Sequence, residues 1–459
     1  MIPRVLIAGL RGGSGKTLVA VGLQAAWRRR GLVVAPFKKG PDFIDPAWSS
    51  AAAGRPCRNL DLFLFSPERL AASFAAGSSG ADIAVVEGNR GLFDGVDSAG
   101  TYSTAELAKA LSCPVVLVVD CTKATRTVAA GVLGCMHLDP GVPLRGVVLN
   151  RTGGARHEST IRTAVEEATG LPVVGVLPRL PGEILPERHM GLVPPAEHSG
   201  REEAVREAGD AAARYLDLAA VESLARQAPP LDVPVPASCA PGAAVPGRAR
   251  IGVFRDAAFQ FYYPENLEAL VRAGATLVEI SPLRDPFLPD VDAVYAGGGF
   301  PETMAVGLAD NAPFRASVRR AVEAGLPVHA ECGGAVFLGE SLDFGGREYP
   351  MAGALPVSFG FQERPRGHGY SVLKTVAENP FFAVGEELRG HEFHHTFVRS
   401  ASGDLSFAFR VDRGTGFDGR SDGLRVRNVL ACYTHLHALA AETWAPALVA
   451  AGVRFRESR

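Results

Sequence analysis

A glycine-rich loop near the start of the chain has the residue types that bind phosphate. It reads GLRGGSGKT from Gly9 to Thr17, after a predicted strand and before a predicted helix. Glycines let backbone N–H groups turn toward phosphate oxygens, Lys16 can reach the terminal phosphates, and Thr17 can bind Mg²⁺. We therefore expect ATP and Mg²⁺ as cofactors. The residues expected to contact the nucleotide are Gly12, Gly13, Ser14, Gly15, Lys16 and Thr17.

The spacing of this loop departs from the standard motif. Five residues separate Gly9 from Gly15, where the standard phosphate loop has four. An ordinary glycine turn between strand and helix is the alternative, but the Gly-Lys-Thr ending favours nucleotide binding. The longer loop resembles that of dethiobiotin synthetases and their relatives, which transfer phosphate to a substrate. The resemblance indicates a synthetase rather than a mechanical ATPase.

A second candidate site centres on Cys332. The segment from Val328 to Ala335 (VHAECGGA) reads as strand, sharp turn and helix, which is typical of a nucleophile elbow. A helix N-terminus behind the thiol would lower its pKa and favour the thiolate. Backbone N–H groups of Gly333, and of Gly298 and Gly299 in another loop, are predicted to form an oxyanion hole.

A histidine should serve as the base for this cysteine. The candidates are His391, His394, His395, His435 and His437. His435 follows a predicted strand in the sequence Tyr-Thr-His, which resembles the Tyr-x-His of cobyrinate-type class I glutamine amidotransferases. Many class I enzymes have His-x-Glu there, but position 437 is histidine, so we expect a Cys–His pair without a third member. The block from Gly390 to His395 is expected to have a structural or interdomain role rather than to bind zinc.

Two loops rich in acids and lysine follow predicted strands in the first half. They are PFKKGPDFIDP, from Pro36 to Pro46, and EGNRGLFDG, from Glu87 to Gly95. In a doubly wound sheet the strand ends converge on the ligand crevice. Turn formation alone explains proline, glycine and aspartate in such loops, but not the density of acids and lysines. Phosphoryl transfer needs charge neutralisation of this kind.

These two loops resemble the signatures of the cobyrinic acid a,c-diamide synthase family, and the resemblance covers essentially the whole chain. It implies that Thr17 and Glu87 hold Mg²⁺ together with Asp42 or Asp45. The catalytic residues that it implies are Lys38, Asp45, Asp94, Cys332 and His435. In these roles Lys16 and Lys38 would neutralise the transferred phosphoryl group. Asp45 and Asp94 would orient the substrate carboxylate and the attacking ammonia.

Further positions are assigned by resemblance alone. Asn150 ends a predicted strand and resembles the asparagine that reads the nucleotide base in dethiobiotin synthetases. Lys39, Trp48 and Arg90 depart from the commonest family pattern and add two cations and an indole to loops expected to face the substrate. We expect the cations to pair with carboxylates that are not amidated and the indole to lie against a macrocycle. Lineage drift within a working enzyme is the alternative.

The elements that must position these residues form two α/β domains. Alternating strands and helices predict an N-terminal doubly wound parallel sheet over residues 1–230, and the resemblance of the phosphate loop implies that this domain is dethiobiotin-synthetase-like. Strands are expected at Arg4 to Ala8 and Leu32 to Phe37. A segment rich in proline, alanine and glycine, residues 231–249, reads as a linker. Residues 250–459 are expected to form a class I glutamine amidotransferase domain.

Composition is that of an ordinary globular protein. The 459 residues carry a net charge of -2, which gives no reason to expect nucleic acid as a partner. No apolar run is long enough to predict a membrane span, and the N-terminus does not read as a signal peptide. The seven cysteines form no CxxC pair and read as reduced thiols, so we expect a cytoplasmic protein.

The function implied by the family resemblance is ATP- and glutamine-dependent amidation of the a and c acetate groups of cobyrinic acid. Glutamine and a tetrapyrrole are the expected partners, and a homodimer is one candidate assembly. Another acetate-bearing tetrapyrrole, such as siroheme or nickel-sirohydrochlorin, is an alternative substrate. An alternative of another class is a ParA-like nucleotide switch with a degenerate glutaminase domain.

Overall fold

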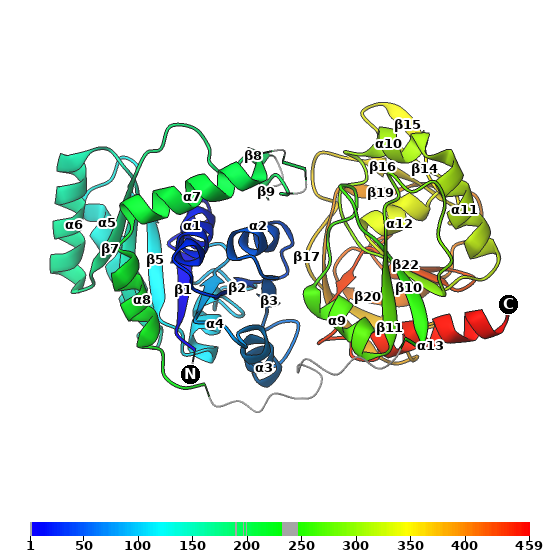
Figure 1. Ribbon diagram of the computed structural model, residues 1–459, viewed down its shortest axis with the longest axis horizontal. Coiled ribbons are helices and arrows are strands. Elements are labelled where there is room, and N and C mark those ends of the chain that lie inside the picture. Colours follow the sequence, from blue (N-terminus) through cyan, green and yellow to red (C-terminus); the bar gives the residue numbers. More distant parts are fainter. Residues whose placement is uncertain (1, 189–190, 196, 199, 232–246) are drawn as a thin grey trace. The chain divides into compact units, whose positions relative to one another are not determined.

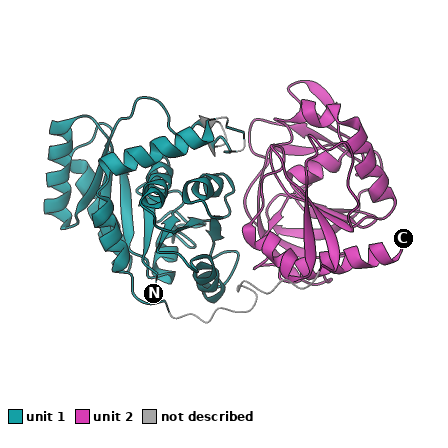
Figure 2. Cartoon of the chain, in the orientation of Figure 1, with its two compact units in different colours: residues 1–240 teal, residues 241–459 magenta. Residues whose placement is uncertain are grey.

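The computed structural model describes residues 2–188, 191–195, 197–198, 200–231 and 247–459. The chain divides into two compact units, Met1–Ala240 and Pro241–Arg459, which Figure 2 draws in teal and magenta. We call them unit 1 and unit 2. Most of the predicted linker, residues 231–249, lies outside the described residues. The predicted domain boundaries therefore stay predictions.

Unit 1 is built on a parallel sheet of seven described strands in the order β3-β2-β4-β1-β5-β6-β7. The strands are β1 Arg4–Gly9, β2 Val34–Lys39, β3 Arg58–Leu60, β4 Ile83–Glu87, β5 Val115–Asp120, β6 Leu144–Thr152 and β7 Val173–Pro178. A short hairpin adds β8 Glu187–Arg188 and β9 Gly191–Leu192. The continuous apolar run of β5 is buried, as expected for a strand covered on both faces. The predicted doubly wound parallel sheet is confirmed.

Helices flank this sheet (Figure 1). They are α1 Lys16–Arg29, α2 Ile44–Ala53, α3 Pro67–Gly77, α4 Thr104–Ala110, α5 Arg126–Leu138, α6 Ala155–Thr169, α7 Arg201–Tyr215 and α8 Leu218–Arg226. Helices α1 and α7 pack closely at Gly22, where an added Cβ would lie 2.7 Å from the carbonyl oxygen of Ala208. This packing holds α1, and with it the phosphate loop at its N-terminus, against the sheet.

Strand β2 begins and ends two residues later than the strand predicted at Leu32 to Phe37, so it takes in Lys38 and Lys39. A buried strand end can hold Lys38 because carboxylates surround its ammonium group. Strand β4 lies between β1 and β2, so the carboxyl ends of β1, β2 and β4 meet. The phosphate loop and both acidic loops leave the sheet at this edge.

Unit 2 has a mixed sheet of ten described strands in the order β11-β10-β12-β13-β22-β21-β20-β17-β18-β23, and a second sheet ordered β15-β14-β16-β19. In the larger sheet, strands β11 to β22 in that order run parallel and the remaining neighbours are antiparallel. The strands of unit 2 are β10 Ala249–Phe254, β11 Ala275–Ile280, β12 Ala293–Ala296, β13 Val328–Glu331, β14 Ser341–Phe344, β15 Arg347–Pro350, β16 Val357–Phe361, β17 Gly367–Thr375, β18 Glu387–His394, β19 Thr396–Ala401, β20 Phe407–Arg413, β21 Ser421–Val426, β22 Val429–Cys432 and β23 His435–Leu436. The helices are α9 Pro264–Arg272, α10 Ala305–Asp310, α11 Ala312–Glu323, α12 Gly333–Leu338 and α13 Trp444–Glu457.

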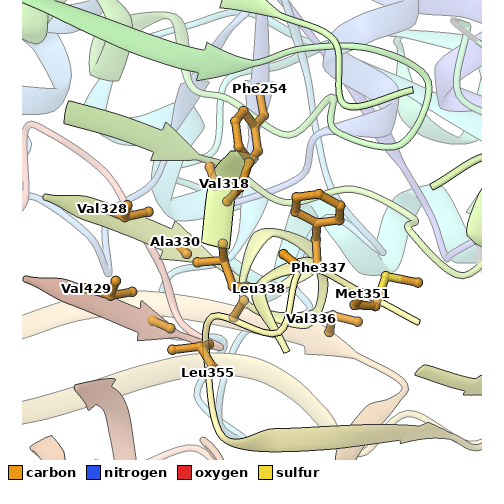
Figure 3. Close-up of a cluster of buried hydrophobic side chains, with 14 of the residues drawn as sticks. Phe254, Val318, Val328, Ala330, Val336, Phe337, Leu338, Met351, Leu355 and Val429 are labelled. Carbon is orange, nitrogen blue, oxygen red and sulfur yellow. The ribbon is translucent and has the colours of Figure 1, made fainter. Parts of the chain in front are cut away.

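Two apolar cores lie on the two faces of the parallel strands. In Figure 3, Val336, Phe337 and Leu338 of α12 lie among side chains of β13, β22 and α11. Strand β13 contributes Val328 and Ala330 to this core. Its alternate residues, His329 and Glu331, are buried as well and lie on the opposite face, because side chains alternate along a strand. This alternation places an acid directly before Cys332 in a buried environment.

A helix that spans a membrane must be both long and apolar. Within the ranges that the structure describes, no helix has the length and apolar character needed to cross a bilayer.

Candidate active sites

The phosphate loop of unit 1 is held in an open turn. Gly13 and Gly15 have φ values of 71° and 95°, which favour glycine, and an added Cβ at Gly12 or Gly13 would meet no atom within 4 Å. The Ser14 hydroxyl is turned inward and donates to the carbonyl oxygen of Arg11 at 2.9 Å. Space around Gly12 and Gly13 and the α1 N-terminus behind them fit a bound phosphate group.

Asn150 supports this loop from β6. Its Nδ2 donates to the carbonyl oxygen of Ser14 at 2.9 Å, and its Oδ1 accepts from the backbone of Arg151 at 2.9 Å. An added Cβ at Gly15 would lie 2.2 Å from Nδ2 of Asn150. The side chain therefore contacts the loop backbone, and its predicted role in reading the nucleotide base stays a prediction.

Lys38 lies at the centre of three carboxylates at the ends of β2 and β4. Its Nζ is 2.5 Å from Asp45 Oδ2, 3.0 Å from Glu87 Oε1 and 4.0 Å from Asp42 Oδ2. Thr17 of the phosphate loop donates its hydroxyl to Glu87 Oε1 at 2.7 Å. Residues predicted from three separate segments of the sequence are thus brought together in one cluster.

Burial and mutual charge set the ionisation of this cluster. Burial disfavours the charge of Lys38, but the carboxylates of Asp45, Glu87 and Asp42 outweigh it and raise the pKa of Lys38. Burial raises the pKa of Asp42 to about 7, and the charge of Asp45 adds to this effect. Burial also raises the pKa of Glu87, against the charge of Lys38. In Asp45 the same burial is outweighed by Lys38, which lowers its pKa.

The residues predicted to bind Mg²⁺ fit a hard cation. Oε2 of Glu87 is buried and has no hydrogen-bond partner among the described residues, and Oε1 already contacts Thr17. Across the described ranges, no group of three or more His, Cys, Asp or Glu side chains is arranged to hold a metal ion. Mg²⁺ is commonly bound by one or two protein oxygens together with substrate phosphates. Thr17 and Glu87 suit that pattern, with Asp42 and Asp45 beside them.

Two further charged residues, Lys16 and Asp94, belong to the surroundings of the cluster. The side chain of Lys16 crosses Gly9, where an added Cβ would lie 3.1 Å from its Cγ and Cδ atoms. Burial, and then the charge of Lys38, lower the pKa of Lys16. Asp94 is exposed, and its Oδ2 accepts from the backbone of Gly91 at 2.7 Å. Asp94 therefore stabilises its own loop while its charge acts on Lys16.

The residues expected to contact the substrate, Lys39, Trp48 and Arg90, differ in their burial. Arg90 is exposed and has a φ of 51°. Burial is the main cause of the lowered pKa of Lys39, and the charge of Arg90 lowers it further. Lys39 is 7% exposed. The charges of these two residues interact, and their role in binding substrate carboxylates stays a prediction.

Trp48 does not face a substrate, and that prediction is wrong. It is fully buried in α2, in a core with Val21 and Ala25 of α1. Its indole Nε1 donates to the carbonyl oxygen of Val193 at 3.0 Å. Apolar burial and a satisfied N–H group make this ring a structural element of unit 1.

In unit 2, Cys332 occupies a strained turn between β13 and α12. Its φ of 47° and ψ of −104° are unusual for a residue with a side chain and cost about 1–3 kcal/mol. Its backbone N–H donates to the carbonyl oxygen of Cys432 at 2.7 Å, and its own carbonyl oxygen accepts from Val336 at 3.0 Å. The core of Figure 3 fixes α12 behind it. The turn has the form of a nucleophile elbow.

The resting state of the thiol differs from the expectation. Burial, and then the charge of Glu302, raise the pKa of the Cys332 thiol above its ordinary value. The backbone N–H of Gly333, at the start of α12, acts in the expected direction, but burial outweighs it, so the expected net lowering of the pKa is wrong. A thiol that stays protonated needs a base at the moment of attack.

His435 lies against the glycine loop that follows β12. An added Cβ at Gly298 would lie 2.4 Å from Cε1 of His435 and 3.3 Å from its Nε2. An added Cβ at Gly333 would lie 3.0 Å from the backbone nitrogen of Gly299. The structure thus gathers the predicted oxyanion-hole glycines and the predicted base around the elbow. Their catalytic roles stay predictions.

Sequence reasoning missed one acid in this site, Glu331. Its Oε2 lies 3.5 Å from Nδ1 of His435, and its Oε1 lies 3.2 Å from Nε2 of His329. Burial would raise the pKa of Glu331, but contacts with these two histidines lower it to about 2. The available signal was its position next to the nucleophile, on the face of β13 opposite Ala330.

The histidines of the block from Gly390 to His395 are also buried in unit 2. His391 stacks on His435 with ring centroids 5.0 Å apart, and its Nδ1 is 3.2 Å from the hydroxyl of Tyr263. Glu392 accepts backbone N–H groups of Thr415 and Gly416. These contacts fit the structural role that was expected for the block, and that role stays a prediction.

The two sites together define a class of protein. A nucleotide-binding α/β unit followed by a cysteine–histidine amidotransferase unit is the organisation of a glutamine-hydrolysing carbon–nitrogen ligase. The comparisons with known proteins agree with this class. Residues 5–193 match the CobQ/CobB/MinD/ParA nucleotide binding domain. Residues 250–443 match the CobB/CobQ-like glutamine amidotransferase domain.

Relatives of nearly the same length narrow the class to one family. The chain is 44% identical over 450 residues to a cobyrinate a,c-diamide synthase of Magnetococcus marinus, covering 97% of this chain and 96% of the relative. It is 42% identical to one of Archaeoglobus fulgidus, with 95% of each chain covered. A hydrogenobyrinate a,c-diamide synthase of Streptomyces coelicolor is 40% identical, with 95% of this chain and 94% of the relative covered. The chain belongs to the cobyrinate a,c-diamide synthase family.

Family membership decides between the two classes considered for the sequence. The N-terminal match alone includes MinD and ParA proteins, so it leaves a nucleotide switch open. The relatives align over both units and are named as synthases. The chain is therefore an enzyme, and the ParA-like alternative is not retained.

Proposed function

We propose that this enzyme amidates the a and c acetate carboxylates of cobyrinic acid during cobalamin biosynthesis, with ATP and glutamine as co-substrates. The observation that carries the substrate assignment is the 44% identity to a cobyrinate a,c-diamide synthase over 97% of this chain. The geometry supports the chemistry, because each unit holds residues for one half of such a reaction.

Unit 1 would activate the carboxylate. A carboxylate resists attack by ammonia because its leaving group would be oxide, and transfer of the γ-phosphoryl group of ATP replaces that oxide by phosphate. Lys16 and Lys38 would neutralise charge on the transferred group. Their support is the cluster in which Lys38 contacts Asp45 and Glu87 beside the phosphate loop.

Mg²⁺ is part of this proposal. Thr17 and Glu87 would hold the ion, with Asp42 or Asp45 nearby, and the partnerless Oε2 of Glu87 supports the assignment. When bound, the ion would neutralise negative charge on the nucleotide phosphates. Asp45 and Asp94 would then orient the substrate carboxylate and ammonia, which displaces phosphate and loses a proton to give the amide.

Unit 2 would supply ammonia. Cys332 Sγ would attack the side-chain amide of glutamine while His435 takes the thiol proton, and His435 would return that proton to the departing ammonia. Water would then release glutamate from the thioester. Backbone N–H groups of Gly299 and Gly333 would stabilise the oxyanion, and their closeness at the elbow supports this role.

A second substrate has specific support. The Streptomyces coelicolor relative is named for hydrogenobyrinate, and it is 40% identical over 95% of this chain.

The experiment that tests the proposed substrate incubates the purified enzyme with ATP, Mg²⁺ and glutamine. Cobyrinic acid, hydrogenobyrinic acid or sirohydrochlorin is then added in separate reactions. Mass spectrometry follows replacement of hydroxyl by amino groups. We expect two amides on cobyrinic acid, and a preference for either other acid would replace the proposed substrate.

A cytoplasmic location and a homodimer are the remaining parts of the proposal. The six cysteines that the structure describes are free, which supports the predicted cytoplasmic location. A homodimer stays a prediction that light scattering on the purified protein would decide.

A further inference from the structure

The base of the glutaminase site has a carboxylate partner that does not come from its own strand. His435 is two residues before His437, the position at which a His-x-Glu sequence would supply an orienting acid. His437 cannot do so, and its Nε2 lies 3.6 Å from Oε2 of Glu265 on α9. We propose that Glu331, the residue directly before the nucleophile, is the positioning residue for His435. This inference rests on the proposed glutaminase function of unit 2.

The position of Glu331 is fixed from several elements. Oε2 accepts the hydroxyl of Tyr295 on β12 at 3.1 Å, and Oε1 accepts the backbone N–H of Leu436 at 3.1 Å. Tyr295 in turn accepts from Nδ2 of Asn266 at 3.1 Å. The glutamate is 1% exposed, so water does not compete for its oxygens. A carboxylate held in this way can determine the orientation of a neighbouring imidazole.

The geometry at His435 assigns different roles to its two nitrogens. Nδ1 lies 3.5 Å from Oε2 of Glu331, and the Cε1 atom between the two nitrogens faces Gly298. A proton held on Nδ1 leaves the Nε2 lone pair to accept a proton from a thiol. The 3.5 Å separation is longer than a hydrogen bond, and such contacts at catalytic groups often tighten when substrate binds.

Groups from several elements face the pair of His435 and Glu331. His391 of β18 covers the ring face of His435, and burial and then His435 itself hold the pKa of His391 well below its ordinary value. His329 shares Glu331 through Oε1, at 3.2 Å. A neutral His391 and an ionised Glu331 favour a proton on the Nδ1 side of His435.

The path of the chain explains why an acid at position 331 can replace one at position 437. Glu331 pairs in register with Cys432 across β13 and β22, and the chain then turns at Tyr433 and Thr434 before β23. His435 pairs with His391 on β18. The turn brings His435 back over the end of β13, so nucleophile and orienting acid are adjacent in sequence and the base alone comes from elsewhere.

The test compares Glu331→Gln with a matched variant, Glu265→Gln, which removes the charge of another buried glutamate paired with a histidine. Glutamate release from glutamine is measured. We expect Glu331→Gln to lower kcat by about 100-fold or more with KM changed by less than about threefold, because a positioning acid acts mainly on the chemical step. Glu265→Gln should keep kcat within about threefold of the wild type, on the same reasoning. Glu331→Asp, which restores the charge, should recover part of the loss.

Three results would overturn the inference: wild-type kcat in Glu331→Gln, an equal loss of kcat in Glu265→Gln, or a loss that appears in KM alone. If Glu331→Gln does not fold, ¹⁵N NMR of the histidine-labelled wild type still decides. The ring signals of His435 are identified as those that disappear in the His435→Asn variant. They should show a proton on Nδ1, and a proton on Nε2 would contradict the proposal. A wild-type protein that releases no glutamate from glutamine would instead refute the proposed function itself.

Discussion

The two candidate sites differ in the buried charges that they contain. In unit 1, Lys38 lies among three carboxylates, and the charges compensate one another before any ligand binds. In unit 2, burial raises the pKa of the Cys332 thiol, and the carboxylate of Glu331 is placed one residue away and turned toward the base. In the first site the charged groups are in place before a phosphoryl group binds. In the second site the nucleophile becomes charged only during the reaction.

The difference follows from the chemistry that each site supports. Phosphoryl transfer moves negative charge among oxygens and needs cations in fixed positions rather than a protein nucleophile. Acyl transfer from an amide needs a nucleophile that becomes charged at the moment of attack. The strained backbone of Cys332 and the glycines around it serve that second need. Substitutions should therefore separate the two sites cleanly.

The largest separation is expected from Cys332→Ser. Glutamine-dependent synthesis should fall by about 10³-fold or more, since the nucleophile is removed. Synthesis from added ammonium salt should remain, because unit 1 holds its own site. Both rates are measured by mass spectrometry of the amide product. The control is Cys432→Ser, since Cys432 is equally buried but lies within β22 and outside the elbow. Loss of ammonia-driven synthesis in a folded Cys332→Ser protein would end the comparison.

The converse separation is expected from Glu87→Gln. Synthesis should fall by about 100-fold from either nitrogen source, because Glu87, which contacts Lys38 and is proposed to hold Mg²⁺, loses its charge. Glutamate release should continue. Glu68→Gln, at the exposed start of α3, is the control. Asp45→Asn should act in the same direction, and near-normal synthesis by either variant would remove that residue from the site.

Acid should remove the stabilisation that the carboxylate of Glu331 gives to unit 2. The pKa of Glu331 is lowered from its ordinary 4.5 to about 2, so the native state holds fewer protons than the unfolded state between these values. The stabilisation of the native state by ionised Glu331 is complete above about pH 4.5 and is lost as the pH falls toward 2. The slope of the free energy of unfolding against pH is set by the difference in bound protons between the two states. Over that range Glu331→Gln should lose less free energy of unfolding than the wild type, by about 1–3 kcal/mol. Urea titrations monitored by tryptophan fluorescence, at pH 5 and at lower pH, measure it. Equal acid dependence of the two proteins would show that the histidine contacts of Glu331 do not stabilise unit 2.

The smallest effect is expected at Arg90, at the edge of the unit 1 cluster. Arg90→Met should raise the KM for the tetrapyrrole severalfold while kcat changes little, because a contact to a non-reacting carboxylate is made equally in ground and transition states. Initial rates against substrate concentration measure both constants. Arg30→Met, at the exposed C-terminal end of α1, is the control. An unchanged KM would make Arg90 an ordinary surface charge.

Local motifs made much of this molecule predictable. The phosphate loop and the elbow at Cys332 each consist of consecutive residues, so the sequence displays the turn and its chemistry together. Alternation of apolar strands with helices predicted the parallel sheet of unit 1. The strand boundary at β2 shifted because Lys38 is neutralised by Asp45 of its own loop and by Glu87, which lies 49 residues further along the chain.

What could not be predicted depended on contacts between distant segments. Trp48 lies in a stretch of loop-like residues, but the packing of α2 on α1 and the carbonyl group of Val193 decide that it is buried. The link between Glu331 and His435 depends on the register of β13, β22 and β23. The pKa of Cys332 depends on burial by the surrounding core, which outweighs a local helix end.

The contact between Asn150 and the phosphate loop has a thermodynamic consequence. An amide from β6 holds the Ser14 carbonyl group, and Arg151 donates from its Nη1 to the Gly13 carbonyl oxygen at 2.9 Å. The glycines of the loop are thereby ordered during folding, when their large conformational entropy is lost. A nucleotide that binds later would meet a loop with few conformations left to lose. Its binding entropy should therefore reflect released water and ions more than ordering of the chain.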